Sequence, residues 1–201
     1  MMYSMRPSWR ALGPGDVTQA ADFVARQPLE RRRYGQHLPQ LHSIWLALLQ
    51  RHCIKGVVVE DLDQPGDICG LAVTAFVSDE FVAEAKTAPG FWLGPELVRR
   101  IDTGTDAILP AKQIRLANSR LGLNLAAWFC HLRINPASRA SDATFMEGFL
   151  QEYRGFQFKE LFAQPADPPN VLTPHKAGLF RWDYAAQAYD VGWAGQGIEE
   201  M

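Results

Sequence analysis

The segment 135–142 holds residue types that bind anions, and it stands just before an expected helix. Its sequence, Asn-Pro-Ala-Ser-Arg-Ala-Ser-Asp, follows a long apolar run and precedes an amphipathic stretch. The first turn of a helix has free backbone N–H groups and the positive end of the helix dipole, so it favours negative charge. Arg139, Ser141 and Asp142 are therefore the candidate anion-binding residues, with Arg139 supplying positive charge. The segment contains no glycine, so it is not one of the Gly-rich loops that cradle phosphates.

The cysteines and histidines do not have the spacing of a metal or nucleophile site. His37 and His42 are the histidines with a gap of five, which matches no metal-ligand pattern. Cys130 and His131 are neighbours on an expected strand and point to opposite faces, so they cannot act as nucleophile and base. We expect no metal. The chain has three cysteines, which lie singly inside apolar segments as small core residues do: Cys53, Cys69 and Cys130.

The composition is that of an ordinary globular domain. The 201 residues are 47% hydrophobic and 21% charged, with a net charge of −2, and this length suits a single domain with a real core. A basic cluster at 31–33 has two interpretations, a patch for an anionic partner or a solvated helix or loop face. No aromatic residues are interleaved with these arginines, which argues against direct nucleic-acid binding.

Membrane and export signals are not evident in the sequence. No apolar run reaches the roughly 18 residues that a membrane helix needs, and the first residues have no long apolar centre. We therefore expect a cytoplasmic protein that does not associate with membranes.

The first half of the chain predicts a strand, two helices and a hairpin. Asp16 and Gln19 have the spacing of a helix capping box. Residues 63–67 have strong turn chemistry, so the strands on either side should form an antiparallel hairpin. The second strand of that hairpin is apolar on both faces, which favours a central position in a sheet. The expected elements are strand 10–12, a helix from 16, helix 41–53, strand 55–62 and strand 68–77.

The second half predicts a further central strand, a helix and an edge strand. Strict alternation along 123–134 places Leu125, Phe129 and His131 on one face, and Ala126 and Trp128 on the other. The expected elements are short helices and turns over 79–122, strand 123–134, helix 143–153, strand 156–162, a Pro-rich linker over 165–174, and a tail over 178–193 that could add a strand and a short helix.

The order of these elements resembles that of the GNAT fold, the fold of the Gcn5-related N-acetyltransferases. Residues 10–24 (RALGPGDVTQAADFV) are similar to the first strand and capped helix of that family, and residues 151–162 (QEYRGFQFKELF) resemble its helix-to-strand passage. Three segments, 70–81, 106–129 and 153–162, are most similar to a GNAT-like domain at the N-terminus of bacterial LuxR-type transcription regulators.

The resemblance implies an α+β fold, with a GNAT-like central mixed, mainly antiparallel sheet flanked by helices. It implies a GNAT-like domain over residues 1–164 that carries a helical insertion at 79–122. Residues 165–201 would then be a Pro-rich linker and a C-terminal tail that packs on the same domain.

The resemblance also implies acetyl-CoA or another acyl-CoA as ligand and, for an enzyme, N-acyltransferase activity. In catalytic GNAT members the turn after the fourth strand carries an Arg/Gln-x-x-Gly-x-Gly/Ala motif, whose backbone N–H groups bind the pyrophosphate. The corresponding segment here, 135–142, lacks the glycines, and Arg139 is its only basic residue. The chain thus resembles a divergent N-acyltransferase without the usual pyrophosphate-binding motif.

A GNAT enzyme also needs a group that takes the proton of the amine. The resemblance implies Glu80 or Glu160 as this base, with His131 in the cleft. Each has a structural alternative: Glu80, with Asp79, as a turn or helix-capping residue, Glu160 as an edge-strand charge paired with its neighbours, and His131 as a hydrogen-bonded structural residue. The candidate acids for the departing thiolate are Tyr153, Tyr184 and Tyr189.

The other interpretation is a non-catalytic sensory or interaction domain in transcription regulation, as the similarity to regulators implies. The tail beyond 174 is too short for a helix-turn-helix, so the chain would be either a stand-alone relative of such domains or a domain that acts through a partner. The resemblance also implies a homodimer, since the tail is rich in aromatic residues. A small-molecule ligand could lie beside Phe91, Trp92 and Trp128, whose other interpretation is ordinary aromatic core.

Overall fold

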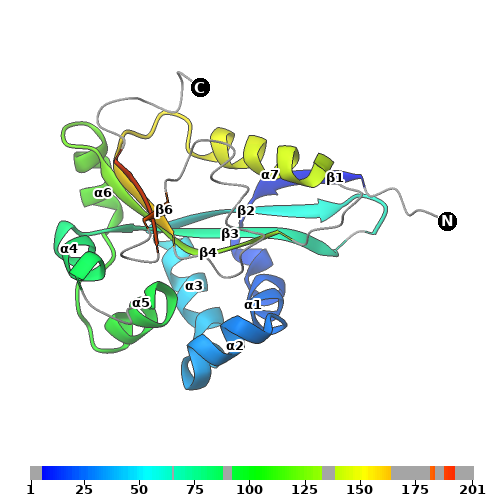
Figure 1. The fold of residues 1–201 in the computed structure, drawn as a ribbon, viewed down its shortest axis with the longest axis horizontal. Coiled ribbons are helices and arrows are strands. Elements are labelled where there is room, and N and C mark those ends of the chain that lie inside the picture. Colours follow the sequence, from blue (N-terminus) through cyan, green and yellow to red (C-terminus); the bar gives the residue numbers. More distant parts are fainter. Residues whose placement is uncertain are drawn as a thin grey trace.

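The computed structural model describes residues 6–64, 66–87, 92–132, 139–163, 182–183 and 188–192. They form a seven-stranded sheet with helices on both faces, and its strand order is β1-β2-β3-β4-β5-β7-β6 (Figure 1). β4 and β5 pair in parallel, while the other neighbouring strands are antiparallel. The expected α+β class, with a mixed and mainly antiparallel sheet, is therefore confirmed.

The elements have the following bounds. The strands are β1 (Pro7–Ala11), β2 (Ile54–Asp61), β3 (Ile68–Val77), β4 (Leu123–Leu132), β5 (Phe158–Ala163), β6 (Trp182–Asp183) and β7 (Ala188–Gly192). The helices are the 3-10 helices η1 (Pro14–Asp16) and η2 (Gly35–Gln40), and the α-helices α1 (Val17–Ala25), α2 (Pro28–Tyr34), α3 (Leu41–Gln50), α4 (Asp79–Thr87), α5 (Leu93–Asp102), α6 (Ala111–Asn118) and α7 (Arg139–Glu152).

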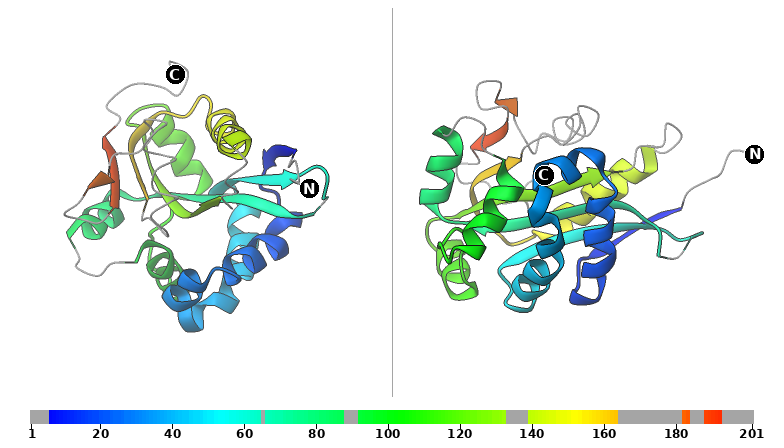
Figure 2. Two further views of the ribbon diagram at one scale, coloured as in Figure 1. Left: turned by 45° about the vertical axis from the view of Figure 1, so that its right-hand side comes forward. Right: turned by 90° about the horizontal axis from the view of Figure 1, so that it is seen from below.

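Two apolar clusters fill the space on either side of the sheet. The larger one packs α1, α3 and α5 against one face, with Trp45 fully buried among them. The smaller one packs α7 against the other face, around Phe145, Phe149 and Tyr153. Figure 2 shows these two layers from the side. β3 is buried along its whole length, as expected for a central strand. No helix in the described ranges is both long and apolar enough to span a bilayer.

The N-terminal region differs from expectation in two details. Asp16 does not cap α1 with its side chain. Its Oδ2 instead accepts hydrogen bonds from the backbone N–H of Gly13 at 2.8 Å and from Arg10 at 2.5 Å. The polar residues after α1 also form a helix, α2, which was not expected because its three consecutive arginines hide the burial of Glu30 and Tyr34.

β4 contains a β-bulge at Trp128. On β3, Val73 pairs with Phe129 and the next residue, Thr74, pairs with Ala127, so Trp128 has no residue opposite it. Beyond the bulge the two faces of the strand exchange. Phe129 joins Trp128 in the larger cluster, although alternation had placed them on opposite faces. The strict alternation expected along this strand is therefore correct through Trp128 and wrong from Phe129 onward.

The connection between β3 and β4 is far longer than the topology needs. Antiparallel neighbours can be joined by a turn of about two to five residues, but here residues 78–122 form α4, α5 and α6. The connection is tied to the end of β3 by the backbone bonds Leu109 N–H to Phe76 O, 2.8 Å, and Ser78 N–H to Ala107 O, 3.0 Å. These helices therefore surround one end of the sheet (Figure 1).

The C-terminal tail contributes two strands to the sheet. β7 pairs antiparallel with β5, with Leu161 opposite Val191, and β6 pairs with β7. The predicted linker at 165–174 lies outside the described residues.

Candidate functional site

The parallel pair β4–β5 ends before β4 does. Their pairing runs from Leu123 and Phe158 to Ala127 and Ala163, while β4 continues to Leu132. Over the described residues, the edge of β4 from 128 to 132 that faces away from β3 has no paired strand. Backbone N–H and C=O groups on such an edge are available to pair with a ligand. The open edge, residues 128–132, is therefore the first candidate site.

Buried hydrogen-bond donors surround the bulge at the start of the open edge. Tyr34 Oη, Trp45 Nε1 and Trp128 Nε1 are buried, and within the described ranges none of them makes a hydrogen bond of good geometry. The indole N–H of Trp128 still lies close enough to the Tyr34 hydroxyl to lower the pKa of that tyrosine against the effect of burial. The rings of Trp45 and Trp128 meet edge to face at 6.0 Å. Gly94 allows Tyr34 and Trp128 to converge, since a Cβ there would lie 2.7 Å from Tyr34 Cζ and 3.4 Å from Trp128 Cδ1.

These donors indicate a place for an acceptor atom. A buried polar group without a partner costs about 1–3 kcal/mol, so native proteins keep few of them. Burial, reinforced by the charge of Glu30, raises the pKa of Tyr34 well above its usual value. The Tyr34 hydroxyl therefore keeps its proton and stays a donor.

His131 lies on the open edge, beyond the bulge. Its side chain is half-buried on the face that carries α1. The imidazole centroid is 5.6 Å from the ring of Phe23 and 6.3 Å from that of Phe129. The structure therefore places a titratable side chain beside the unpaired backbone of β4.

A second polar group gathers at the other end of β4. Asp79 Oδ1 accepts hydrogen bonds from Asn124 Nδ2 at 2.6 Å and from Lys159 Nζ at 2.9 Å. The bond from Lys159, followed by that from Asn124, lowers the pKa of Asp79. Glu80 follows Asp79 in the first turn of α4 and is exposed. These side chains line a cavity that is described below.

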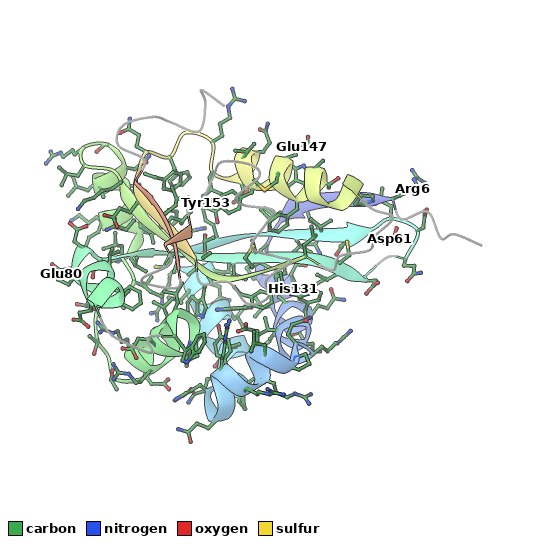
Figure 3. The ribbon with its side chains drawn as sticks, viewed as in Figure 1. Arg6, Asp61, Glu80, His131, Glu147 and Tyr153 are labelled. Carbon is green, nitrogen blue, oxygen red and sulfur yellow. The ribbon has the colours of Figure 1, made fainter. Side chains whose placement is uncertain are left out.

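The structure does not bring the three predicted catalytic residues together. Glu80 and His131 lie at opposite ends of β4 (Figure 3), and the seven residue steps from Asn124 to His131 span roughly 20 Å of strand. Glu160 is opposite Asn124 in the parallel register, so it belongs to the Glu80 end. Glu80 and His131 therefore cannot act on the same reacting atom.

The predicted anion-binding residues fall inside α7. Helix α7 begins at Arg139, so Arg139, Ser141 and Asp142 form its first turn instead of a preceding loop. The helix starts four residues earlier than expected because the sequence there lacks glycine and tolerates helical backbone. Their side chains, and all of 133–138, lie outside what the structure describes.

The aromatic candidates separate into surface and core. Trp92 is 46% exposed, and the guanidinium of Arg33 lies 4.2 Å from its ring centre. Tyr153 is fully buried under α7 and hydrogen-bonded to Thr74, which makes it a core residue. Tyr189 lies on β7, and its side chain, like Phe91 and Tyr184, falls outside the described part of the chain.

Sequence reasoning missed Tyr34 and Asn124. Asn124 carried a signal, because it and His131 are the two polar side chains in a strand of ten residues that is otherwise apolar. Tyr34 carried none, since it follows three arginines and only the tertiary structure buries it beside Gly94.

The chain has no match among protein-family models or curated protein sequences. Its structure is similar to a predicted acetyltransferase from Clostridium acetobutylicum solved with acetyl-CoA, with a TM-score of 0.52, 11% identity, and coverage of 98% of this chain and 99% of that chain. It is also similar to a polyamine N-acetyltransferase of Drosophila melanogaster, with a TM-score of 0.49, 13% identity, and coverage of 96% and 92%. A GCN5-related N-acetyltransferase from Ralstonia eutropha has a TM-score of 0.44, 13% identity, and coverage of 85% and 91%. The likeness shows the fold alone: this chain has the GNAT fold.

Proposed function

We propose that this protein binds an acyl-CoA at the open edge of β4 and transfers the acyl group to an amine. The observation that carries the proposal is the early end of the β4–β5 pairing, which leaves 128–132 unpaired in the described part. The GNAT fold supports it, because acyl-CoA is the ligand that the sequence resemblance implies.

The residues present fit such a ligand in three places. The backbone of 128–132 offers donors and acceptors to the amide groups of the pantetheine arm. Tyr34 Oη and Trp128 Nε1 are buried donors that suit an acyl carbonyl. The first turn of α7, with Arg139, Ser141 and Asp142, is where the phosphates would lie, since a 14-residue helix presents free N–H groups there.

The reaction requires one proton to be moved. When bound, the thioester supplies the acyl group: the amine nitrogen bonds to the carbonyl carbon as the C–S bond breaks, and one proton passes from nitrogen to sulfur. We assign the role of base to His131, because it lies on the open edge, whereas Glu80 and Glu160 lie at the other end of β4. A histidine suits this task since imidazole gains and loses a proton near neutral pH.

Calorimetry with the full chain tests the binding step. Acetyl-CoA, octanoyl-CoA and free CoA are titrated in turn, and at least one acyl-CoA should bind with heat and raise the melting temperature. No heat and no thermal shift with any of them would refute the proposal.

Turnover tests the reaction. Free thiol release is followed with acyl-CoA and a panel of primary amines. The variant His131→Gln should keep acyl-CoA binding, lower kcat about 100-fold and remove the limb of the pH profile due to the base. The control His42→Gln changes an exposed histidine that bonds Thr18 on the helical layer, and it should leave the rate unchanged. Binding without turnover of any amine would favour the sensory or interaction domain that the resemblance to transcription regulators implies.

A further inference from the structure

A cavity of about 610 Å³ lies at the end of the sheet opposite the open edge. Its walls come almost entirely from the long connection between β3 and β4. Every lining residue except Val77, Asn124 and Lys159 belongs to residues 78–122. A short turn could join these two strands, so the topology does not require so long a connection. What the connection adds to the fold is the wall of this cavity. The lining includes Asp79, Glu80, Asp106, Leu116, Leu121 and Asn124.

The wall formed by β4 presents a buried acceptor. Asp79 is an acceptor, so the hydrogen bond from Asn124 fixes the amide nitrogen toward Asp79. Because nitrogen and oxygen belong to the same planar amide group, this bond also fixes Asn124 Oδ1 on the side of the group away from Asp79. Asn124 is only 4% exposed, and its Oδ1 has no hydrogen-bond partner among the residues that the structure describes. Such an atom calls for a donor.

The charges around the cavity favour a cation. Lys159 and Asp79 neutralise each other across 2.9 Å. This leaves the carboxylates of Glu80 and Asp106 against the guanidinium of Arg120. The two carboxylates outnumber the one guanidinium. Their oxygens, like Asn124 Oδ1, are hydrogen-bond acceptors. The polar side of a ligand here should therefore carry N–H donors and positive charge.

The rim of the cavity is apolar and exposed. Leu116 is 51% exposed and Leu121 81% exposed, two of the five large hydrophobic side chains that lie open on the described surface. Exposed leucines that line a cavity gain free energy when a ligand covers them. The ligand should therefore carry an apolar body next to its cationic head.

We propose that this cavity is a second ligand site, which binds a primary ammonium with an apolar chain or ring. The ammonium N–H groups pair with the carboxylates and the amide oxygen of the β4 wall, and the apolar body covers Leu116 and Leu121. The site is separate from the acyl-transfer site at the other end of β4, and its occupation does not require an acyl-CoA.

Chemical-shift mapping of the full chain by NMR, without any acyl-CoA, tests the assignment with four probes: hexylamine, hexanol, hexanoate and methylamine. At neutral pH, hexylamine should shift the amide signals of residues 78–82, 106–124 and 159 with a dissociation constant in the millimolar range. Hexanol and methylamine should bind at least about threefold more weakly, since each lacks one half of the ligand, and hexanoate should not bind. Equal binding of hexanol and hexylamine, or shifts centred on 128–132, would overturn the proposal.

Two variants separate the apolar and charged contributions. Leu121→Ser should weaken hexylamine at least about threefold, whereas the control Leu62→Ser, at an exposed leucine just after β2, should not change it. The double variant Glu80→Gln/Asp106→Asn should weaken hexylamine and leave hexanol unchanged, because it removes charge without removing apolar surface. Unchanged hexylamine binding in both cavity variants would overturn the site. A negative result for hexylamine would not bear on acyl-CoA binding at the open edge, because the NMR experiment contains no acyl-CoA and the acyl-CoA site is tested by calorimetry.

Discussion

Asn124 donates a hydrogen bond of 2.6 Å from its side-chain amide to Asp79, and this bond joins the start of β4 to the first turn of α4. Lys159 of β5 donates to the same carboxylate oxygen at 2.9 Å. The helical connection 78–122 is thereby tied to both strands of the parallel pair. The Asp79 carboxylate thus connects α4, β4 and β5 at the wall of the proposed ammonium cavity.

The Asp79 carboxyl group should titrate below its ordinary range. Its bond from Lys159, and then that from Asn124, lowers its pKa in the folded state. The contribution to stability is therefore present above the ordinary pKa of about 4 and is lost as the pH falls through the lower folded value. Because the side chain is 65% exposed, solvent screening keeps this contribution under about 1 kcal/mol. Carboxyl-carbon NMR titration should show the lowered pKa, and Lys159→Met should raise it. An unchanged pKa in that variant would contradict the assignment.

Tyr34 and Tyr153, which are buried in the described part of the chain, should resist ionisation until the protein unfolds. Burial is the main cause that raises the pKa of both Tyr34 and Tyr153. The folded state keeps these protons when the unfolded state loses them, so this contribution to stability is full below about pH 10 and declines as the pH rises above it. Tyrosinate absorbance and circular dichroism, followed together, should show both tyrosines ionising only with unfolding. Complete ionisation of all five tyrosines with native dichroism would contradict this.

Gly94→Ala should destabilise the protein by about 2–3 kcal/mol through overpacking. The new Cβ would meet Tyr34, with Cζ at 2.7 Å and Oη nearer still. Adding Tyr34→Phe should restore part of the loss, because it removes the nearest atom. Urea denaturation measures both variants. The matched control is Gly15→Ala, whose Cβ meets nothing within 4 Å, and it should change stability by less than about 0.5 kcal/mol.

Lys55 and Glu152 should show a measurable coupling energy. Their ion pair is 2.5 Å long and mostly shielded from solvent, and Lys55 also lies 5.5 Å from the ring centre of Phe156. Glu152 is the last residue of α7, where a negative charge opposes the helix dipole. A double-mutant cycle with Lys55→Met and Glu152→Gln should give about 1 kcal/mol. The same cycle on the exposed pair Arg6–Asp63, 3.5 Å apart, should give close to zero, and equal values for the two pairs would contradict the prediction.

Local patterns in the sequence predicted most of the elements, because a helix or strand that is buried on one face has apolar residues at regular spacing along the sequence. The hairpin of β2 and β3, the buried face of α3 and the central strand β3 all follow from such patterns. Helix α2 did not, since a seven-residue helix has too few turns to show a period. The resemblance also supplied Glu80, Glu160 and His131 as candidates for proton transfer, but it did not show which of them share a site.

By itself, the sequence determined the order of most strands and helices, and with it the resemblance to the GNAT fold. Only the tertiary structure decided which residues meet. A single extra residue, Trp128, shifts β4 against β3 and exchanges its faces, and whether a strand bulges depends on the partner strand, which no local pattern records. The bonds of Asn124 and Lys159 to Asp79 likewise join residues 45 and 80 positions apart in the chain. Such contacts arise only when the sheet has formed, so the chemistry of both proposed sites is a property of the folded chain.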